Sequence, residues 1–302
     1  MALIVPALSA CGDGAARSGD GARKIKVVCT TTMIADLARE LVGDDAQVIS
    51  IMRPGEDPHI YDVRPRDDQM IGDADVVLYN GLHLEATLLD IIQHRAGSKA
   101  KVVALAEDQR IKPLGSADPG KAGTGAADPH CWFNIEHFQV YTQRARAALM
   151  DADPANAEKY RERANAYLLK LEELHAWTKV QIATVPREQR VMITSHDAFQ
   201  YFGQAYDIEV HAVIGISTEQ QAKPQDLERL ERLVKDRNVR ALFIETSVSK
   251  VLNDLVKRVA ADSGAKIGGT LFSDSLDEPG KPAGTYVGMV KHNVTTVVEA
   301  LK

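Results

Sequence analysis

Short apolar runs alternate with amphipathic stretches along this chain, and this alternation restricts its fold more than any other feature. In the first half the runs are IKVVCT (25–30), QVISI (47–51), DVVLYN (75–80) and KVVAL (101–105). In the second half they are VMIT (191–194), IEVHAV (208–213), ALFIE (241–245) and AKIGGTLF (265–272). Such runs are typical of strands that are buried on both faces. Between the first two runs, Thr32 is expected to cap a helix that ends at Gly43. Strands that alternate with helices predict parallel sheets with right-handed crossovers, and therefore an α/β fold.

A long segment without glycine or proline separates the two halves. After Asp153 and Pro154, which can begin a helix, residues 155–184 contain neither residue type. At a rise of 1.5 Å per residue, a helix of this length spans about 45 Å, more than one small lobe needs. We therefore predict two α/β lobes joined by one long helix. The predicted boundaries are 24–153 for the first lobe, 154–185 for the linker helix and 186–302 for the second lobe.

The residues before the first predicted strand read as a signal and a tether. Residues 1–10 are apolar and uncharged, and Leu8-Ser9-Ala10-Cys11 is similar to a bacterial lipobox, whose cysteine is acylated after cleavage. The glycine-rich stretch up to residue 23 is typical of a flexible tether. We expect lipidation at Cys11 and an extracytoplasmic protein, either periplasmic or a membrane-anchored lipoprotein. The alternative is a disordered tail with an incidental cysteine.

Composition excludes several other classes of protein. The 302 residues are 45% hydrophobic and 26% charged, with a formal net charge of -6. The apolar content argues against intrinsic disorder, and the interspersed charges give no basic footprint for nucleic acid. No C-x-x-C pair is present, which excludes a thiolate zinc knuckle and a dithiol redox motif. Cys29 is expected to be a small buried hydrophobic residue. The protein is expected to be a monomer.

Candidate functional residues follow the predicted strands. Ligands of open α/β sheets bind at the carboxyl ends of strands. His59, His196, Glu245 and Asp274 fall in such positions, and His130 lies where a loop enters a helix. Three neutral imidazoles and a carboxylate suit a first-row divalent cation such as Zn²⁺ or Mn²⁺. The spacing alone is not diagnostic, since each of these residues also has an ordinary structural interpretation. His59 can be a solvated loop residue, His130 a helix cap, and Asp274 an Asx-turn residue.

Four motifs together carry a resemblance to a known family. GEDPHIYDVRPRD, DPHCWFN, TSHDAFQYF and LFSDSLDEPGKPAGTYVGMVKHNV resemble the zinc/manganese-type (cluster A-I) substrate-binding proteins of bacterial metal ABC transporters. The resemblance runs from about residue 24 to the C-terminus. It implies two Rossmann-like lobes with mainly parallel sheets, tied by a rigid helix, with one metal ion in the cleft between them. Carried onto this sequence, the implied ligands are His59, His130, His196 and Asp274.

The resemblance also bears on the metal and on Glu245. Many zinc-dedicated members of the family carry a histidine-rich loop before the second ligand motif, whereas residues 115–127 here contain no histidine. This difference favours Mn²⁺ or mixed specificity, although nitrogen and oxygen sites generally bind Zn²⁺ more tightly. Glu245 is either an outer residue that orients a ligand imidazole or a structural carboxylate. Cys131 is expected to lie near the metal without binding it.

The function that follows is capture of a metal ion and its delivery to an ABC permease, without catalysis. Because the imidazoles must be neutral to bind metal, affinity is expected to fall as the pH drops through about 6 to 5. Two alternatives use the same residues. One is a zinc-dependent hydrolase with Glu245 as general base. The other is a surface adhesin in which the metal only stabilises the fold.

Overall fold

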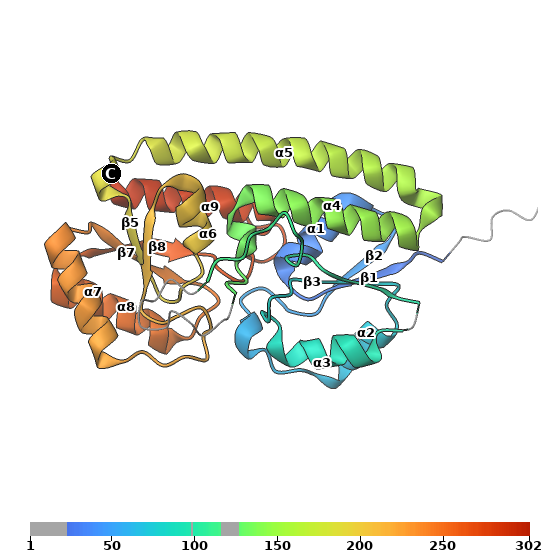
Figure 1. The fold of residues 1–302 in the computed structure, drawn as a ribbon, viewed down its shortest axis with the longest axis horizontal. Helices are drawn as coiled ribbons and strands as arrows, with labels where there is room; N and C mark the ends of the chain where they lie inside the picture. Colours follow the sequence, from blue (N-terminus) through green and yellow to red (C-terminus); the bar gives the residue numbers. More distant parts are fainter. Residues whose placement is uncertain (1–22, 98, 116–126) are drawn as a thin grey trace, which may run out of the picture.

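Two four-stranded parallel sheets form the framework of the protein (Figure 1). The structure, a computed structural model, describes residues 23–97, 99–115 and 127–302. Cys11 and its predicted lipidation lie outside the described residues, as does most of the histidine-free loop 115–127. Within the described ranges, no helix is both long enough and apolar enough to cross a membrane.

The two sheets have the same topology. The first, in the order β2-β1-β3-β4, consists of β1 (Lys26–Cys29), β2 (Gln47–Ser50), β3 (Val76–Tyr79) and β4 (Lys101–Ala104). The second, in the order β6-β5-β7-β8, consists of β5 (Val191–Thr194), β6 (Glu209–Ala212), β7 (Ala241–Glu245) and β8 (Lys266–Leu271). All described strand pairs are parallel. Each strand lies within the apolar run that predicted it, and the predicted two-lobed α/β fold is confirmed.

Helices cover both faces of each sheet. The first lobe contains α1 (Thr32–Val42), α2 (Pro65–Gly72), α3 (Ala86–Arg95) and α4 (Ile135–Ala152). The second contains α6 (Gln200–Tyr206), α7 (Pro224–Arg237), α8 (Lys250–Ser263) and α9 (Tyr286–Leu301). In Figure 1, α2 and α3 lie below the first sheet, while α1 and α4 lie on the side of the long helix. Each lobe is therefore a three-layer α/β/α unit.

The beginning of α1 differs from the sequence-based expectation that Thr32 would cap it. Thr31 is the N-cap instead, and its side chain accepts a hydrogen bond from the Ile34 N–H at 3.4 Å. The hydroxyl of Thr32 is used elsewhere, since it accepts the backbone N–H of Leu276 from the second lobe. The helix ends at Gly43 as expected, with a φ of 52° that favours glycine.

The long helix α5 (Ala157–Ala183) runs along both lobes (Figure 1). It follows a 3-10 turn at Pro154–Asn156 and packs against α1 and α4 in the first lobe and α6 and α9 in the second. Its buried apolar side chains belong to one hydrophobic cluster that includes residues of both sheets. A core shared in this way restricts separation of the lobes, because opening it would expose apolar surface. The boundaries 24–153, 154–185 and 186–302 stay a prediction.

Candidate metal centre

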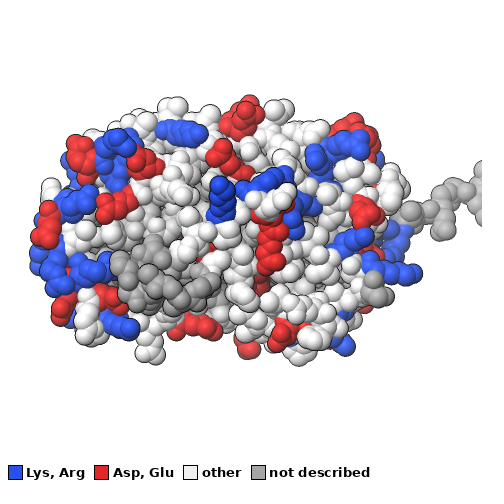
Figure 2. All heavy atoms as spheres, viewed as in Figure 1, with Lys and Arg blue, Asp and Glu red and all other residues white. Residues whose placement is uncertain are grey.

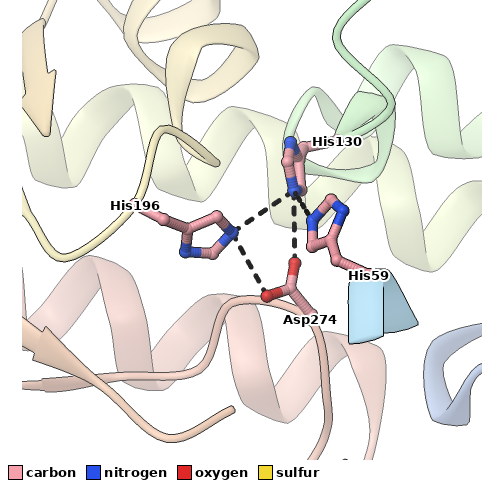
Figure 3. Close-up of side chains that lie close together, drawn as sticks. All are labelled: His59, His130, His196 and Asp274. Carbon is pink, nitrogen blue, oxygen red and sulfur yellow. Dashed lines mark hydrogen bonds and ion pairs between the residues drawn. The ribbon is translucent and has the colours of Figure 1, made fainter. Parts of the chain in front are cut away.

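Four side chains from four separate segments meet between the two sheets (Figure 3). His59 lies on a 3-10 turn (Pro58–Ile60) after β2, and His130 immediately precedes a second turn (Cys131–Phe133). His196 follows β5, and Asp274 follows β8. The four residues are 5%, 0%, 0% and 1% exposed, respectively. His59, His196 and Asp274 thus reach this buried location from the carboxyl ends of parallel strands, and His130 reaches it from the residue before a 3-10 turn.

The polar atoms of these residues face a common point. The Nε2 atom of His130 lies 3.2 Å from Nε2 of His59 and 3.4 Å from Nε2 of His196. The Asp274 carboxylate faces two of the rings, with Oδ1 3.3 Å from Nε2 of His130 and Oδ2 3.3 Å from Nε2 of His196. One ligand atom from each residue lies within 4.8 Å of the other three. This is the arrangement that a single small cation between the four groups requires.

Two further features distinguish this cluster from an ordinary hydrogen-bonded core. A neutral imidazole has one donor and one acceptor nitrogen, so three converging Nε2 atoms cannot all be satisfied by one another. In addition, Oδ1 of Asp274 is buried and makes no hydrogen bond within the described ranges, although Nε2 of His130 faces it at 3.3 Å. Unsatisfied buried polar atoms are costly, and a bound cation would satisfy the nitrogen lone pairs and the carboxylate oxygen together.

Buried carboxylates hold the far sides of two of the rings. Oδ1 of Asp128 lies 2.8 Å from Nδ1 of His130 and also accepts that residue's backbone N–H at 2.9 Å. Oε2 of Glu245 lies 2.7 Å from Nδ1 of His196, while its Oε1 accepts the backbone N–H groups of Ser195 and His196. A carboxylate at Nδ1 places the ring proton there and leaves Nε2 free to bind a metal.

Sequence reasoning missed Asp128, although it is present in the DPH motif. An aspartate two residues before a candidate histidine can fold back onto the imidazole, and this short spacing was the available signal.

Cys131, which follows His130 in the sequence, is a free buried thiol whose Sγ lies 3.8 Å from the backbone oxygen of Asp128. Burial raises the pKa of Cys131 to about 12, so this residue is a neutral thiol at physiological pH. Cys29 is also buried, as expected.

The second-lobe carboxylate is anchored by two serines. The Ser247 hydroxyl accepts the backbone N–H of Asp274 at 3.1 Å and lies 3.2 Å from its Oδ2. The Ser273 hydroxyl lies at the same distance from Oδ2. These contacts all involve Oδ2 or the backbone, which leaves Oδ1 directed toward His130.

Without a metal ion, the imidazoles of His130 and His196, which face carboxylates, favour the protonated state. Burial lowers the pKa of His130, but Asp128 and Asp274 outweigh burial and raise this pKa to about 9. Burial also opposes protonation of His196, and Glu245 and Asp274 raise its pKa well above the usual value. A proton on each ring therefore competes with a metal ion near neutral pH.

The other two groups are ready to bind a cation. Burial is the main cause that lowers the pKa of His59 to about 3, so its imidazole is neutral. Burial raises the pKa of Asp274, but His196 and His130 outweigh this effect and hold the pKa well below its usual value. The carboxylate is therefore ionised.

Comparisons with known proteins agree with the fold over almost the whole chain. Residues 27–300 match the family described as zinc-uptake complex component A, periplasmic (ZnuA). The manganese-binding lipoprotein MntA of Bacillus subtilis (strain 168) is 38% identical over 299 residues, which cover 98% of this chain and 95% of that protein. The manganese ABC transporter substrate-binding lipoprotein PsaA of Streptococcus anginosus is 31% identical over 304 residues, or 99% and 96% of the two chains. The structure of the periplasmic zinc-binding protein TroA from Treponema pallidum matches with a TM-score of 0.86 at 34% identity, covering 92% of this chain and 99% of its own.

Proposed function

Because this chain belongs to the ZnuA family of periplasmic zinc-uptake components, we propose that it captures one Mn²⁺ or Zn²⁺ ion outside the cytoplasm and delivers it to an ABC permease. We assign His59, His130, His196 and Asp274 as the metal ligands. The observation that carries this assignment is the convergence of three imidazole nitrogens and one carboxylate in a buried space between the lobes.

The proposed mechanism is binding and release, with no covalent step. His59 and His130 belong to the first lobe, and His196 and Asp274 belong to the second. Each lobe thus supplies two ligands, and a small change in their relative position alters the ligand set of the ion. The α5 helix and the shared core restrict such changes in the free protein. Contact with the permease is the proposed trigger for release.

The contacts of Glu245 weigh against the hydrolase alternative. One of its carboxylate oxygens accepts the backbone N–H groups of Ser195 and His196, and the other faces Nδ1 of His196. A general base must instead reach a water on the metal. The proposal is therefore a binding protein rather than an enzyme, with Glu245 orienting His196.

The surface charge and the names of the relatives bear on the other partners, namely nucleic acid, the permease and the metal ion. On the face shown in Figure 2, positive and negative side chains are interspersed, which is a poor surface for nucleic acid. We propose a monomer that works with a membrane permease and binds no nucleic acid. The metal can be Mn²⁺ or Zn²⁺, since the relatives' names include both and imidazole-carboxylate sites accept both.

Calorimetric titration of metal-stripped protein tests this function. We expect saturation at one ion per chain with Zn²⁺ and, in a separate experiment, with Mn²⁺. Zn²⁺ should bind more tightly, because nitrogen and oxygen sites follow the general order of divalent-metal affinity. Absence of stoichiometric binding with both ions would refute the proposed function.

Metal binding should release protons at pH 7.5. The pKa values of His130 and His196 are raised, so a metal ion must displace protons from these rings. Affinity should consequently increase with pH from 6 toward 9, a higher range than unperturbed imidazoles predict. The measurement is titration in buffers with different ionisation enthalpies. An apparent binding enthalpy that is identical in all buffers would show that no proton is released.

Replacing Glu245 with glutamine should weaken metal binding by about 10- to 100-fold, because partners that orient a ligand imidazole typically contribute this much. Glu85 provides a matched control. It is also buried and accepts two backbone N–H groups, those of Asn80 and Gly81, but it contacts none of the proposed ligands. Glu85→Gln should lower thermal stability to a similar extent while leaving the affinity for Zn²⁺ unchanged. Equal effects of the two substitutions on affinity would contradict the role assigned to Glu245.

A further inference from the structure

The loop that carries Asp274 makes hydrogen bonds to the first lobe on both sides of this residue. On one side, the indole Nε1–H of Trp132 donates to the backbone oxygen of Ser273 at 3.2 Å. On the other side, the Thr32 hydroxyl accepts the backbone N–H of Leu276 at 2.8 Å. These contacts connect residues 141 and 244 positions apart in sequence, and both are buried.

A third contact joins the same loop to the segment that carries His59. The backbone N–H of Gly55 donates to the Ser275 hydroxyl at 2.7 Å. Gly55 precedes His59 by four residues, between the end of β2 and the 3-10 turn. The position of the Asp274 loop is therefore linked to that of a first-lobe ligand.

Trp132 is also linked to the other first-lobe ligand. Its ring packs edge-on against the ring of His130, with the centroids 5.1 Å apart. Its backbone oxygen accepts the hydroxyl of Tyr286, which begins α9 in the second lobe. Trp132 thus contacts one proposed ligand directly and holds the backbone next to another, Asp274.

From these contacts we infer that Thr32 and Trp132 are positioning residues for the Asp274 ligand, so that the first lobe determines where a second-lobe ligand lies. This inference rests on the proposed metal-binding function. Within the second lobe, Ser247 accepts the backbone N–H of Asp274, and Ser247 and Ser273 both contact its carboxylate. The backbone oxygen of Ser273 and the backbone N–H of Leu276, on either side of Asp274, are held from the first lobe. Movement of the first lobe would therefore shift Asp274 relative to His196, which follows β5 and has its backbone N–H held by Glu245 within the second lobe.

The test replaces Thr32 with valine, which keeps the shape of the side chain and removes the acceptor for the Leu276 N–H. Zn²⁺ affinity should fall by about 10-fold or more, the effect typical of residues that orient a metal ligand. Thr32→Ser keeps the hydroxyl and should bind Zn²⁺ within about twofold of the wild type, close to the usual limit for independent effects. Thr178→Val is the matched control, because Thr178 is fully buried and its hydroxyl donates to the Leu174 backbone oxygen on α5, away from the site.

A double-mutant cycle separates positioning from general destabilisation. In an Asp274→Ala background, Thr32→Val should change Zn²⁺ affinity by less than about twofold, because the ligand it positions is gone. An equal loss of affinity in both backgrounds would overturn the inference. So would unchanged affinity of the Thr32→Val protein when the wild type binds one ion.

The outcomes also distinguish this inference from the proposed function. If the wild type binds no Zn²⁺, the proposed function fails and the inference fails with it. If Thr32→Val does not fold, Ser275→Ala provides the same test from the Gly55 contact, with the same expected loss and the same dependence on Asp274. Unchanged affinity of Ser275→Ala would then overturn the inference.

Discussion

Replacing His196 with alanine should weaken the binding of Zn²⁺ and Mn²⁺ by at least about 100-fold. Loss of a residue that only hydrogen-bonds to a metal ligand typically weakens binding by up to about 100-fold, and loss of a ligand itself should weaken it at least as much. His196 is fully buried, and its Nε2 atom faces both His130 and Asp274. Its loss removes one nitrogen ligand and leaves the carboxylate of Glu245 without the imidazole that it faces. Water can enter the space left by the ring, but it is a weaker ligand than an imidazole held in place.

His211 supplies the control for this substitution. It lies on β6 of the same lobe, is partly exposed, and has Glu209 as its partner at 2.8 Å. His211→Ala also removes an imidazole from the second lobe, and it should bind metal as the wild type does. Titration of both variants with each ion gives the comparison. Retention of wild-type affinity by His196→Ala would remove this residue from the proposed ligand set.

Metal binding should raise stability without being required for folding. An ion present at about 1,000 times its dissociation constant stabilises the folded state by about 4.1 kcal/mol if the unfolded chain does not bind it. For a chain of this size, that corresponds to an increase of roughly 6 °C in the unfolding temperature. The metal-free protein should still unfold cooperatively, because the cluster that joins both lobes through α5 contains no proposed ligand.

Differential scanning calorimetry of the stripped and the loaded protein measures both quantities. His196→Ala should show a much smaller increase at the same metal concentration, which links the effect to the site. A stripped protein without a cooperative transition would contradict this expectation. That result would favour the alternative in which the metal serves only to hold the fold together.

Local patterns in the sequence predicted the sheets closely. All eight strands in the described part of the chain fall inside predicted runs, and β7 matches residues 241–245 without any shift. The reason is that buried parallel strands are continuous apolar runs, which stand out against amphipathic helices. The start of α1 was less accurate, because Thr31 and Thr32 are equally suitable caps by composition. The choice between them depends on Leu276, which is 244 residues away.

The site was predictable to a more limited extent. The position of most candidates after a strand follows from the chain itself, but the choice of His59, His130, His196 and Asp274 as a set came from the family resemblance. Their convergence depends on how two lobes pack, and periodicity carries no information about that packing. The same limitation applies to Asp128 and to the contacts of Trp132, whose roles appear only when segments distant in sequence are placed together.

The most direct test of the proposed function is anomalous diffraction from crystals of the Zn²⁺-loaded protein, measured on both sides of the zinc absorption edge. We predict one strong peak per chain, about 2.0–2.2 Å from Nε2 of His59, His130 and His196 and from a carboxylate oxygen of Asp274. A peak bound to other residues, or no peak at this position in protein that contains one Zn²⁺ per chain, would contradict the account.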